Sequence, residues 1–242
     1  MSARRSVAIL AVVAAAAYYV RTRQHEKFAR TAERSVVPVG ADSTASTDGE
    51  TTATPVAQTL ALNADNTYIS GMLEATDSVI NRWPTKTARP IRVWIASAAG
   101  TPGSLPNGER LVEQAFFEWN LANVPVRFEM SDSAHADVRV GWTERLPQSR
   151  IGVTETRGVN HYFTSGTITI ATHRPNGAEL TEIEVARCAN HEIGHLLGLS
   201  HASDKTSIMY PELVPEMNNT RLTDKDLATV RLWYALPVGH LH

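Results

Sequence analysis

The chain has 242 residues, of which 43% are apolar and 20% are charged. These fractions are typical of a globular protein and exclude a wholly disordered chain, a collagen-like repeat and a polytopic membrane protein. Lysine and arginine number 23 against 25 aspartates and glutamates, so no basic excess favours a nucleic-acid partner, and we expect none. The single cysteine, Cys188, excludes a disulfide framework and a cysteine-based zinc cluster within one chain.

Residues 1–30 are predicted to be a signal peptide or a signal anchor. Arg4 and Arg5 precede an uncharged apolar run, 7–20, which is typical of the hydrophobic region of an export signal. As a helix this run would be about 21 Å long, shorter than the ~30 Å hydrocarbon core of a membrane. The tyrosines and arginines that follow also suit a membrane interface, so a tether through residues 7–20 is one alternative and a buried core helix is another.

Residues 31–59 are predicted to form a disordered linker. They are rich in Ser, Thr, Ala and Gly and cannot bury enough apolar surface to offset the entropy of ordering. The folded domain is predicted to span 60–237, which is ample for one sizeable core, and 238–242 would be a short tail.

Hydrophobic periodicity within this domain predicts the order helix, strand, helix, four strands, helix, irregular stretch, helix. A mixture of this kind indicates an α+β fold. The predicted helices cover 68–80, 109–120, 179–197 and 224–235, and the predicted strands cover 91–96, 126–130, 137–142, 151–156 and 167–172.

The end of the longest predicted helix carries a candidate metal site, HEIGHLLGLSH over 191–201. His191 and His195 are four residues apart and so project from one helical face, where two imidazoles can hold one metal ion at about 2.0–2.1 Å. Gly198 is predicted to end the helix with a left-handed backbone and to bring His201 round as a third ligand. Three histidines leave a fourth tetrahedral position open to water, which is the arrangement of a catalytic zinc site.

Glu192 follows the first histidine and would lie beside the ligand face rather than on it. It would therefore reach a water on the metal rather than the metal itself, and we predict that it is the catalytic general base. The alternative interpretation is a surface helix with solvated histidines, which gives no reason for three histidines and a glycine at this spacing.

These residues resemble the metzincin metallopeptidases, whose signature is HExxHxxGxxH followed by a methionine turn. The candidate turn contains Met209, Tyr210 and Pro211, and Met209 lies eight residues after His201, a spacing similar to that of the matrixin branch. Weaker similarity extends over 88–237 through AFFEWN, VPVRFEM, ADVRVGW and LTDKDLATVRLWYALP. The last of these places Asp226 and Tyr234 on the acidic and tyrosine positions of the matrixin C-terminal helix.

The resemblance implies a metzincin-like α+β domain in which a twisted mixed sheet of about five strands packs on long helices, with the zinc site at the end of the active-site helix. It implies one zinc ion, with Met209 packed beneath the imidazoles. It also implies that an extended peptide substrate pairs antiparallel with an edge strand, for which 151–156 is the candidate. Calcium binding has no support, because the glycine-rich calcium loops of the family have no counterpart between 137 and 172.

The sequence departs from the family in lacking the cysteine switch and the pattern of the structural zinc. Cys188 is expected to be a small buried side chain, and His161 and His173 are expected to be ordinary loop histidines. The predicted function is that of a monomeric zinc endopeptidase, secreted or membrane-anchored, which hydrolyses extracytoplasmic proteins. The alternatives are an exported zinc-binding domain that recognises a partner without cleaving it, and a peptidase dedicated to one partner protein.

Overall fold

The computed structural model describes residues 55–85, 89–213 and 220–241, all within one compact unit, Ala53–His242. The predicted export segment and most of the predicted linker lie outside the described residues. In these described ranges, no helix is both long and apolar enough to cross a membrane.

A five-stranded mixed sheet, in the order β3-β2-β4-β6-β5, is the centre of the fold. Four strands run parallel, and β5 pairs antiparallel with β6 at one edge. The bounds are β2 (Ile91–Ile95), β3 (Phe128–Met130), β4 (Val138–Thr143), β5 (Gly152–Val159) and β6 (Tyr162–Ala171). The predicted α+β class and the mixed sheet of about five strands are therefore confirmed, and the strand at 151–156 is an edge strand.

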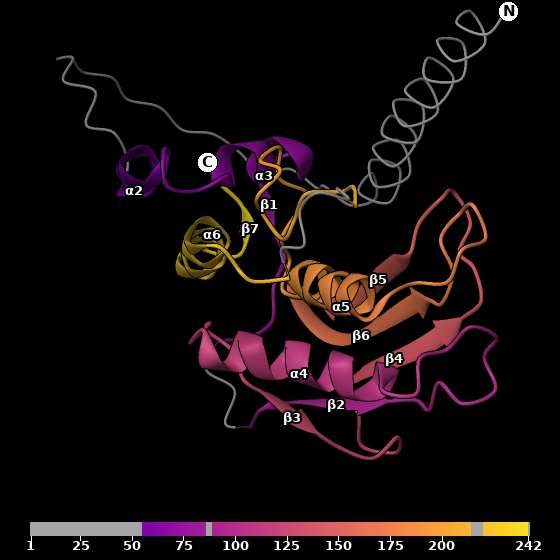
Figure 1. Ribbon diagram of the computed structural model, residues 1–242. Helices are drawn as coiled ribbons and strands as arrows, with labels where there is room; N and C mark the ends of the chain where they lie inside the picture. The colour runs from indigo at the N-terminus through magenta and orange to yellow at the C-terminus, as the bar shows by residue number, and fades with distance from the viewer. Residues whose placement is uncertain (1–54, 86–88, 214–219, 242) are drawn as a thin grey trace, which may run out of the picture. The chain divides into compact units, whose positions relative to one another are not determined.

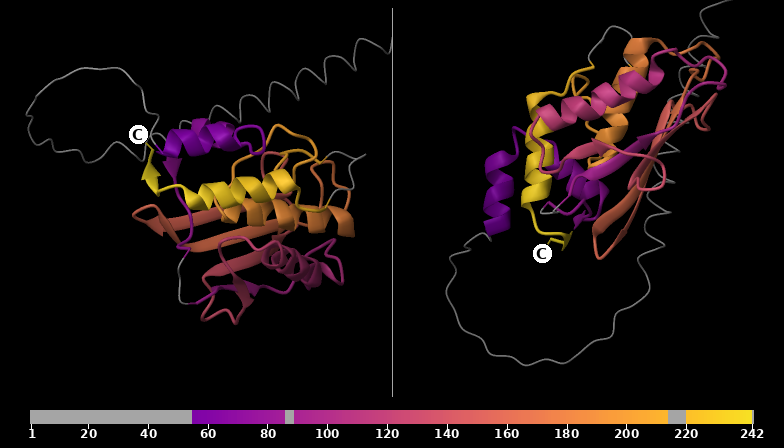
Figure 2. Two further views of the ribbon diagram at one scale, coloured as in Figure 1. Left: turned by 90° about the vertical axis from the view of Figure 1, so that its left-hand side faces the viewer. Right: turned by 90° about the horizontal axis from the view of Figure 1, so that it is seen from below.

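Helices α4 (Gly108–Leu121) and α5 (Glu182–Leu196) lie on the same side of this sheet (Figures 1 and 2). Helix α4 buries Phe116 and Trp119 because its apolar residues recur every three or four positions. Two buried indoles also hold α5, since Trp119 Nε1 donates to the carbonyl of Asn190 at 3.2 Å and Trp83 Nε1 donates to that of Leu196 at 2.9 Å. The site helix is thus fixed to the core by hydrogen bonds as well as by apolar packing.

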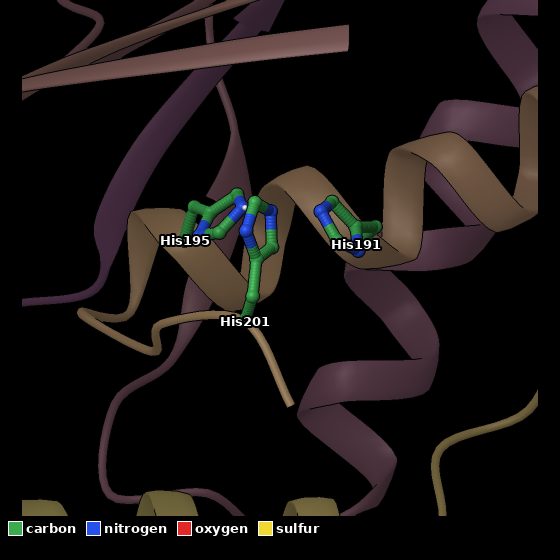
Figure 3. A group of neighbouring side chains, drawn as sticks. All are labelled: His191, His195 and His201. Carbon is green, nitrogen blue, oxygen red and sulfur yellow. Dashed lines mark hydrogen bonds between the residues drawn. The ribbon is translucent and has the colours of Figure 1, made fainter. Parts of the chain in front are cut away.

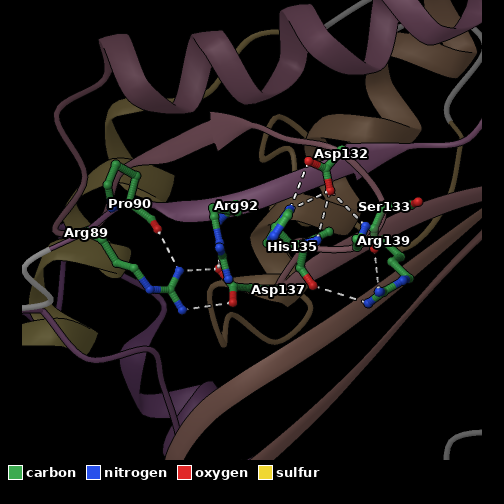
Figure 4. Close-up of polar contacts among 10 residues, drawn as sticks. Arg89, Pro90, Arg92, Asp132, Ser133, His135, Asp137 and Arg139 are labelled. Atoms are coloured by element: carbon green, nitrogen blue, oxygen red, sulfur yellow. Dashed lines mark hydrogen bonds and ion pairs between the residues drawn. The ribbon is translucent and has the colours of Figure 1, made fainter.

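An ion-pair cluster lies beside the sheet, where β2 pairs with the start of β4 (Figure 4). Asp137 accepts hydrogen bonds from Arg89 at 2.6 and 3.0 Å and from the backbone N–H of Arg92 at 2.9 Å. Burial raises the pKa of Asp137, but these arginine and backbone hydrogen bonds outweigh it and lower the pKa to about 2.

The predicted helix over 68–80 was wrong in its second half. Helix α3 covers only Ile69–Ala75, and Asp77 and Ser78 then take left-handed backbone angles that no helix continues through. The chain proceeds as β1 (Val79–Ile80), which pairs antiparallel with β7 (Gly239–His240). Pairing with a strand at the other end of the chain therefore decides the structure there, against the local periodicity.

The ordered structure also differs from the predicted boundaries at both ends of the domain. Helix α2 (Pro55–Asn63) crosses the expected boundary at residue 60, and β7 lies within the stretch expected to be a tail. The second helix predicted, 109–120, and the last, 224–235, agree closely with α4 and with α6 (Asp224–Ala235). Strand β6 starts five residues before its predicted start, because it forms a hairpin with β5 through a left-handed turn at Asn160 and His161.

Candidate metal centre

Helix α5 presents the candidate site and is capped at both ends. It begins three residues later than predicted, because Thr181 and Glu184 form a capping box. It ends at Leu196, and Gly198, which was predicted to end the helix, follows two residues later with a left-handed φ of +96°. There Gly198 N–H donates to the carbonyl of His195 at 2.9 Å and Leu199 N–H donates to that of Gly194 at 3.0 Å. This turn reverses the chain and brings His201 back toward the helix.

Three imidazoles meet where the chain turns back (Figure 3). The candidate ligand atoms of His191, His195 and His201 all lie within 4.8 Å of one another, and the ring centroids are 4.6 to 5.3 Å apart. Among the described residues, this is the one group of three or more His, Cys, Asp or Glu side chains with such a separation. The structure therefore brings the three predicted ligands together.

Two of the three rings are oriented by backbone carbonyls. His191 Nδ1 lies 2.8 Å from the carbonyl oxygen of Ile208, and His195 Nδ1 lies 2.8 Å from that of Leu199. A carbonyl oxygen only accepts, so each Nδ1 carries the proton and each Nε2 keeps its lone pair for a metal.

The distances and the protonation preference both fit a metal ion. His195 Nε2 and His201 Nε2 are 3.2 Å apart, close to the roughly 3.3 Å that separates two nitrogens around one tetrahedral zinc. Burial, followed by the neighbouring imidazoles of His195 and His201, lowers the pKa of His191 well below its usual value. The neutral imidazole that a metal requires is thus the favoured form.

Met209 supports the site by packing and is fully buried. Its sulfur lies against Gly194, between the two helical histidines, at a place where any added Cβ would collide with it. The preceding residue, Ile208, donates its backbone N–H to Asp226 at 3.0 Å while its carbonyl contacts His191. Helix α6, which carries Asp226, therefore holds the turn that orients one of the candidate ligands.

The rest of the methionine turn is more open. The backbone N–H of Tyr210 donates to the carbonyl of Ser207 at 3.2 Å, and Pro211 is exposed. Arg187, from α5, donates hydrogen bonds to the carbonyls of Tyr210 and Glu212 at 3.4 and 3.3 Å and so ties this segment to the helix.

The side chain of Glu192 contacts the edge strand β5. Its side chain is buried, and its Oε2 accepts a hydrogen bond of 2.6 Å from the hydroxyl of Thr154 in β5. Burial raises the pKa of the carboxyl, while nearby His195 and the Thr154 hydrogen bond oppose that rise. A carboxylate in this setting is a stronger base than an exposed one.

Comparison with known proteins decides the family. Residues 101–235 match the family model described as matrixin, which is more than half of the chain. The chain belongs to the matrixin family. The resemblance read from HExxHxxGxxH and the methionine turn is therefore confirmed.

Metalloendoproteinases of two plants and a human collagenase are similar to parts of this chain. Metalloendoproteinase 1-MMP of Arabidopsis thaliana is 30% identical over 133 residues, covering 50% of this chain and 36% of that protein. Metalloendoproteinase 1 of Glycine max is 46% identical over 48 residues, or 20% of this chain and 16% of that protein. Neutrophil collagenase of Homo sapiens is 29% identical over 136 residues, which cover 53% of this chain and 29% of that protein. The matched part of this chain thus covers between 16% and 36% of the length of these three relatives.

The remaining candidate residues of this matrixin domain lie apart from the triad or are buried. Cys188 is buried, with its sulfur 3.5 Å from the carbonyl of Ile151, and burial raises its pKa, as expected for a packing side chain. His161 stands in the hairpin turn against Asn81 at 3.0 Å, and His173 contacts the hydroxyl of Thr172 at 2.9 Å. Neither joins the candidate metal ligands.

Sequence reasoning missed three residues around the site. Thr154 and Gly152 face Glu192 from β5, and Arg187 braces the segment after the methionine turn. Alternation in 151–156 predicted a strand, but no local signal told which alternate residues face the helix. Asp226 was placed on the acidic position of the last helix, and its contact with the methionine turn comes from the structure.

Proposed function

We propose that this matrixin-family chain is a zinc endopeptidase in which His191, His195 and His201 hold one zinc ion and Glu192 is the general base. The observation that carries the proposal is the convergence of the three imidazoles, two of them with Nδ1 on a carbonyl oxygen. When bound, zinc would supply Lewis-acid polarisation of the scissile carbonyl and would acidify the attacking water.

Glu192 would move the proton in this reaction. Its Oε2 is bound by Thr154, which leaves Oε1 to accept a proton from the water and to return it to the leaving amine. Burial raises the pKa of this carboxyl and so strengthens it as a base. A domain that only bound a partner would gain nothing from a buried carboxylate beside the candidate metal ligands, which favours hydrolysis over the non-cleaving alternative.

The peptide would lie along β5. This strand pairs with β6 on one side and is the last strand of the sheet on the other. Its outer N–H and C=O groups can therefore receive an extended substrate, in the antiparallel direction that the family resemblance implies. We further propose that residues 1–30 direct export or anchoring, that the chain is monomeric and that its substrates are extracytoplasmic proteins, with a single dedicated substrate as the narrower possibility.

A peptide-library digestion tests the proposal directly. The purified full chain is incubated with the library as isolated, after chelation and after zinc is restored, with Glu192→Gln in parallel. We expect cleavage that chelation abolishes, that zinc restores and that Glu192→Gln lacks. Zinc binding without any cleavage would favour the partner-binding alternative, and a proteome-wide cleavage profile would distinguish a general peptidase from a dedicated one.

A further inference from the structure

We propose that the edge strand β5 positions the general base, with Thr154 holding one carboxylate oxygen of Glu192 and Gly152 making room for the other. This inference rests on the proposed function, because it concerns how Glu192 would act as a base. It goes beyond that function in assigning a role to two residues that would neither coordinate the metal nor transfer the catalytic proton.

The first step is the hydrogen bond from Thr154. Its hydroxyl lies 2.6 Å from Glu192 Oε2 and 3.0 Å from the backbone oxygen of the same residue. The single hydroxyl proton is therefore shared between two acceptors of Glu192, 38 residues away in sequence, and the shorter contact, to the carboxylate, holds the side chain beside its own backbone oxygen. A charge-assisted hydrogen bond of this length restricts rotation of the carboxylate more than a contact to water would.

The second step is the space that Gly152 leaves. Gly152 is buried and lies two residues before Thr154, so both positions face the same side of β5, toward α5. A Cβ added at Gly152 would collide with Glu192 Oε1 and would lie 2.6 Å from the sulfur of Cys188. Only a residue without a side chain lets Oε1 lie where it does.

Together the two residues set the position of the carboxylate, Thr154 through a hydrogen bond to one oxygen and Gly152 by leaving space for the other. Thr154 restrains Oε2, and the backbone of Gly152 lies beside Oε1, the oxygen that would take the proton. Because β5 is also the strand on which we place the substrate, this one strand would position both the peptide and the general base. Thr154 is therefore a positioning residue that acts through Glu192, since a threonine hydroxyl is no base in this setting.

The test compares Thr154→Val with Thr154→Ser in the zinc-loaded full chain. Valine keeps the shape and removes the hydroxyl, whereas serine keeps the hydroxyl and removes a methyl group. We expect Thr154→Val to lower kcat by about tenfold to a hundredfold with KM and bound zinc unchanged, the range expected for losing a hydrogen bond to a charged group. Thr154→Ser should restore most of kcat. The matched control is Thr169→Val in β6, opposite Val153 in the sheet, which should keep kcat.

A second measurement needs no activity. In the zinc-free chain, Thr154→Val should lower the denaturant midpoint clearly when Glu192 is present and much less in a Glu192→Ala background, because the carboxylate partner is then gone and only the contact to the backbone oxygen remains. Equal shifts in both backgrounds would overturn the proposal. So would a kcat of Thr154→Val within about threefold of wild type, a Thr154→Ser variant as impaired as the valine, or an equal loss in Thr169→Val.

The two proposals fail in different ways. A wild-type chain with no zinc-dependent cleavage would refute the proposed function, and the positioning role would fall with it. A wild-type chain that cleaves, with Glu192→Gln inactive and Thr154→Val fully active, would leave the function intact and refute the positioning role alone.

Discussion

Asp226 offers the sharpest test of how the last helix supports the metal centre. It is fully buried and accepts hydrogen bonds from the backbone N–H groups of Ile208 and Thr223 at 3.0 and 2.9 Å and from the Thr223 hydroxyl at 2.7 Å. The hydroxyls of Ser207 and Tyr68 also donate to it, the latter at 3.4 Å. We predict that Asp226→Asn, which keeps the shape but removes the charge, destabilises the chain substantially.

The magnitude follows from these contacts. If the amide oxygen of asparagine takes the place of Oδ2, the three donors there each exchange a charged acceptor for a neutral one. The difference is about 1 kcal/mol per hydrogen bond, or about 3 kcal/mol of unfolding free energy in all. For a folded unit of this size, that corresponds to a fall of about 6–12 °C in Tm.

The assay is urea denaturation of the zinc-free chain, with Asp224→Asn as the matched control. Asp224 lies in the same first turn of α6 but is exposed, so its substitution changes the helix charge equally and should cost little. Because Ile208 also contacts His191, zinc affinity measured against a chromophoric chelator should fall about 10–100-fold in Asp226→Asn. A loss below about 0.5 kcal/mol, or one equal to that of Asp224→Asn, would refute this reasoning.

Four further predictions follow from the site and the fold. Glu192→Gln should keep one zinc per chain yet lose about 10²–10⁴-fold in peptide turnover, and activity within about threefold of wild type would contradict its role. Elemental analysis should find one zinc per chain and much less after His201→Ala, and two tightly held ions would mean a second site. The lowered pKa of Asp137, about 2, means that its ion pairs stabilise the fold above its unfolded pKa of about 4 and are lost as the pH falls through 2. The stability difference between wild type and Asp137→Asn should therefore shrink from pH 5 to pH 2, and a constant difference would contradict this. Finally, a chain beginning at Ala53 should cleave a fluorogenic peptide as fast as the full chain, and a tenfold gain on truncation would indicate an inhibitory segment.

The parts of this structure that were predictable are those set by local chemistry. The three-residue and four-residue spacing of 191–201 fixes which side chains share a helix face, and Gly198 ends the helix because its backbone is left-handed. Strand alternation located all five strands of the sheet. These features depend on residues a few positions apart, so a single sequence contains them.

The parts that failed depend on partners far along the chain. Val79 and Ile80 continue an apolar stripe, yet they form a strand because Gly239 and His240 lie alongside them. The side of β5 that faces Glu192 is likewise set by where α5 packs on the sheet, which no local pattern in 151–156 reveals. Periodicity reports that a segment has a buried face, and tertiary packing decides what that face meets.

The same distinction explains why the motif by itself is an incomplete description of the centre. HExxH fixes the spacing of two imidazoles, but the proton on each Nδ1 is fixed by the carbonyls of Ile208 and Leu199, which lie outside that five-residue motif. The carbonyl of Leu199 is in place because Gly198 reverses the chain, and that of Ile208 because Asp226 holds its N–H from another helix. An identical motif on a helix without these two supports would present imidazoles free to rotate and to change tautomer, and would bind a metal correspondingly less well.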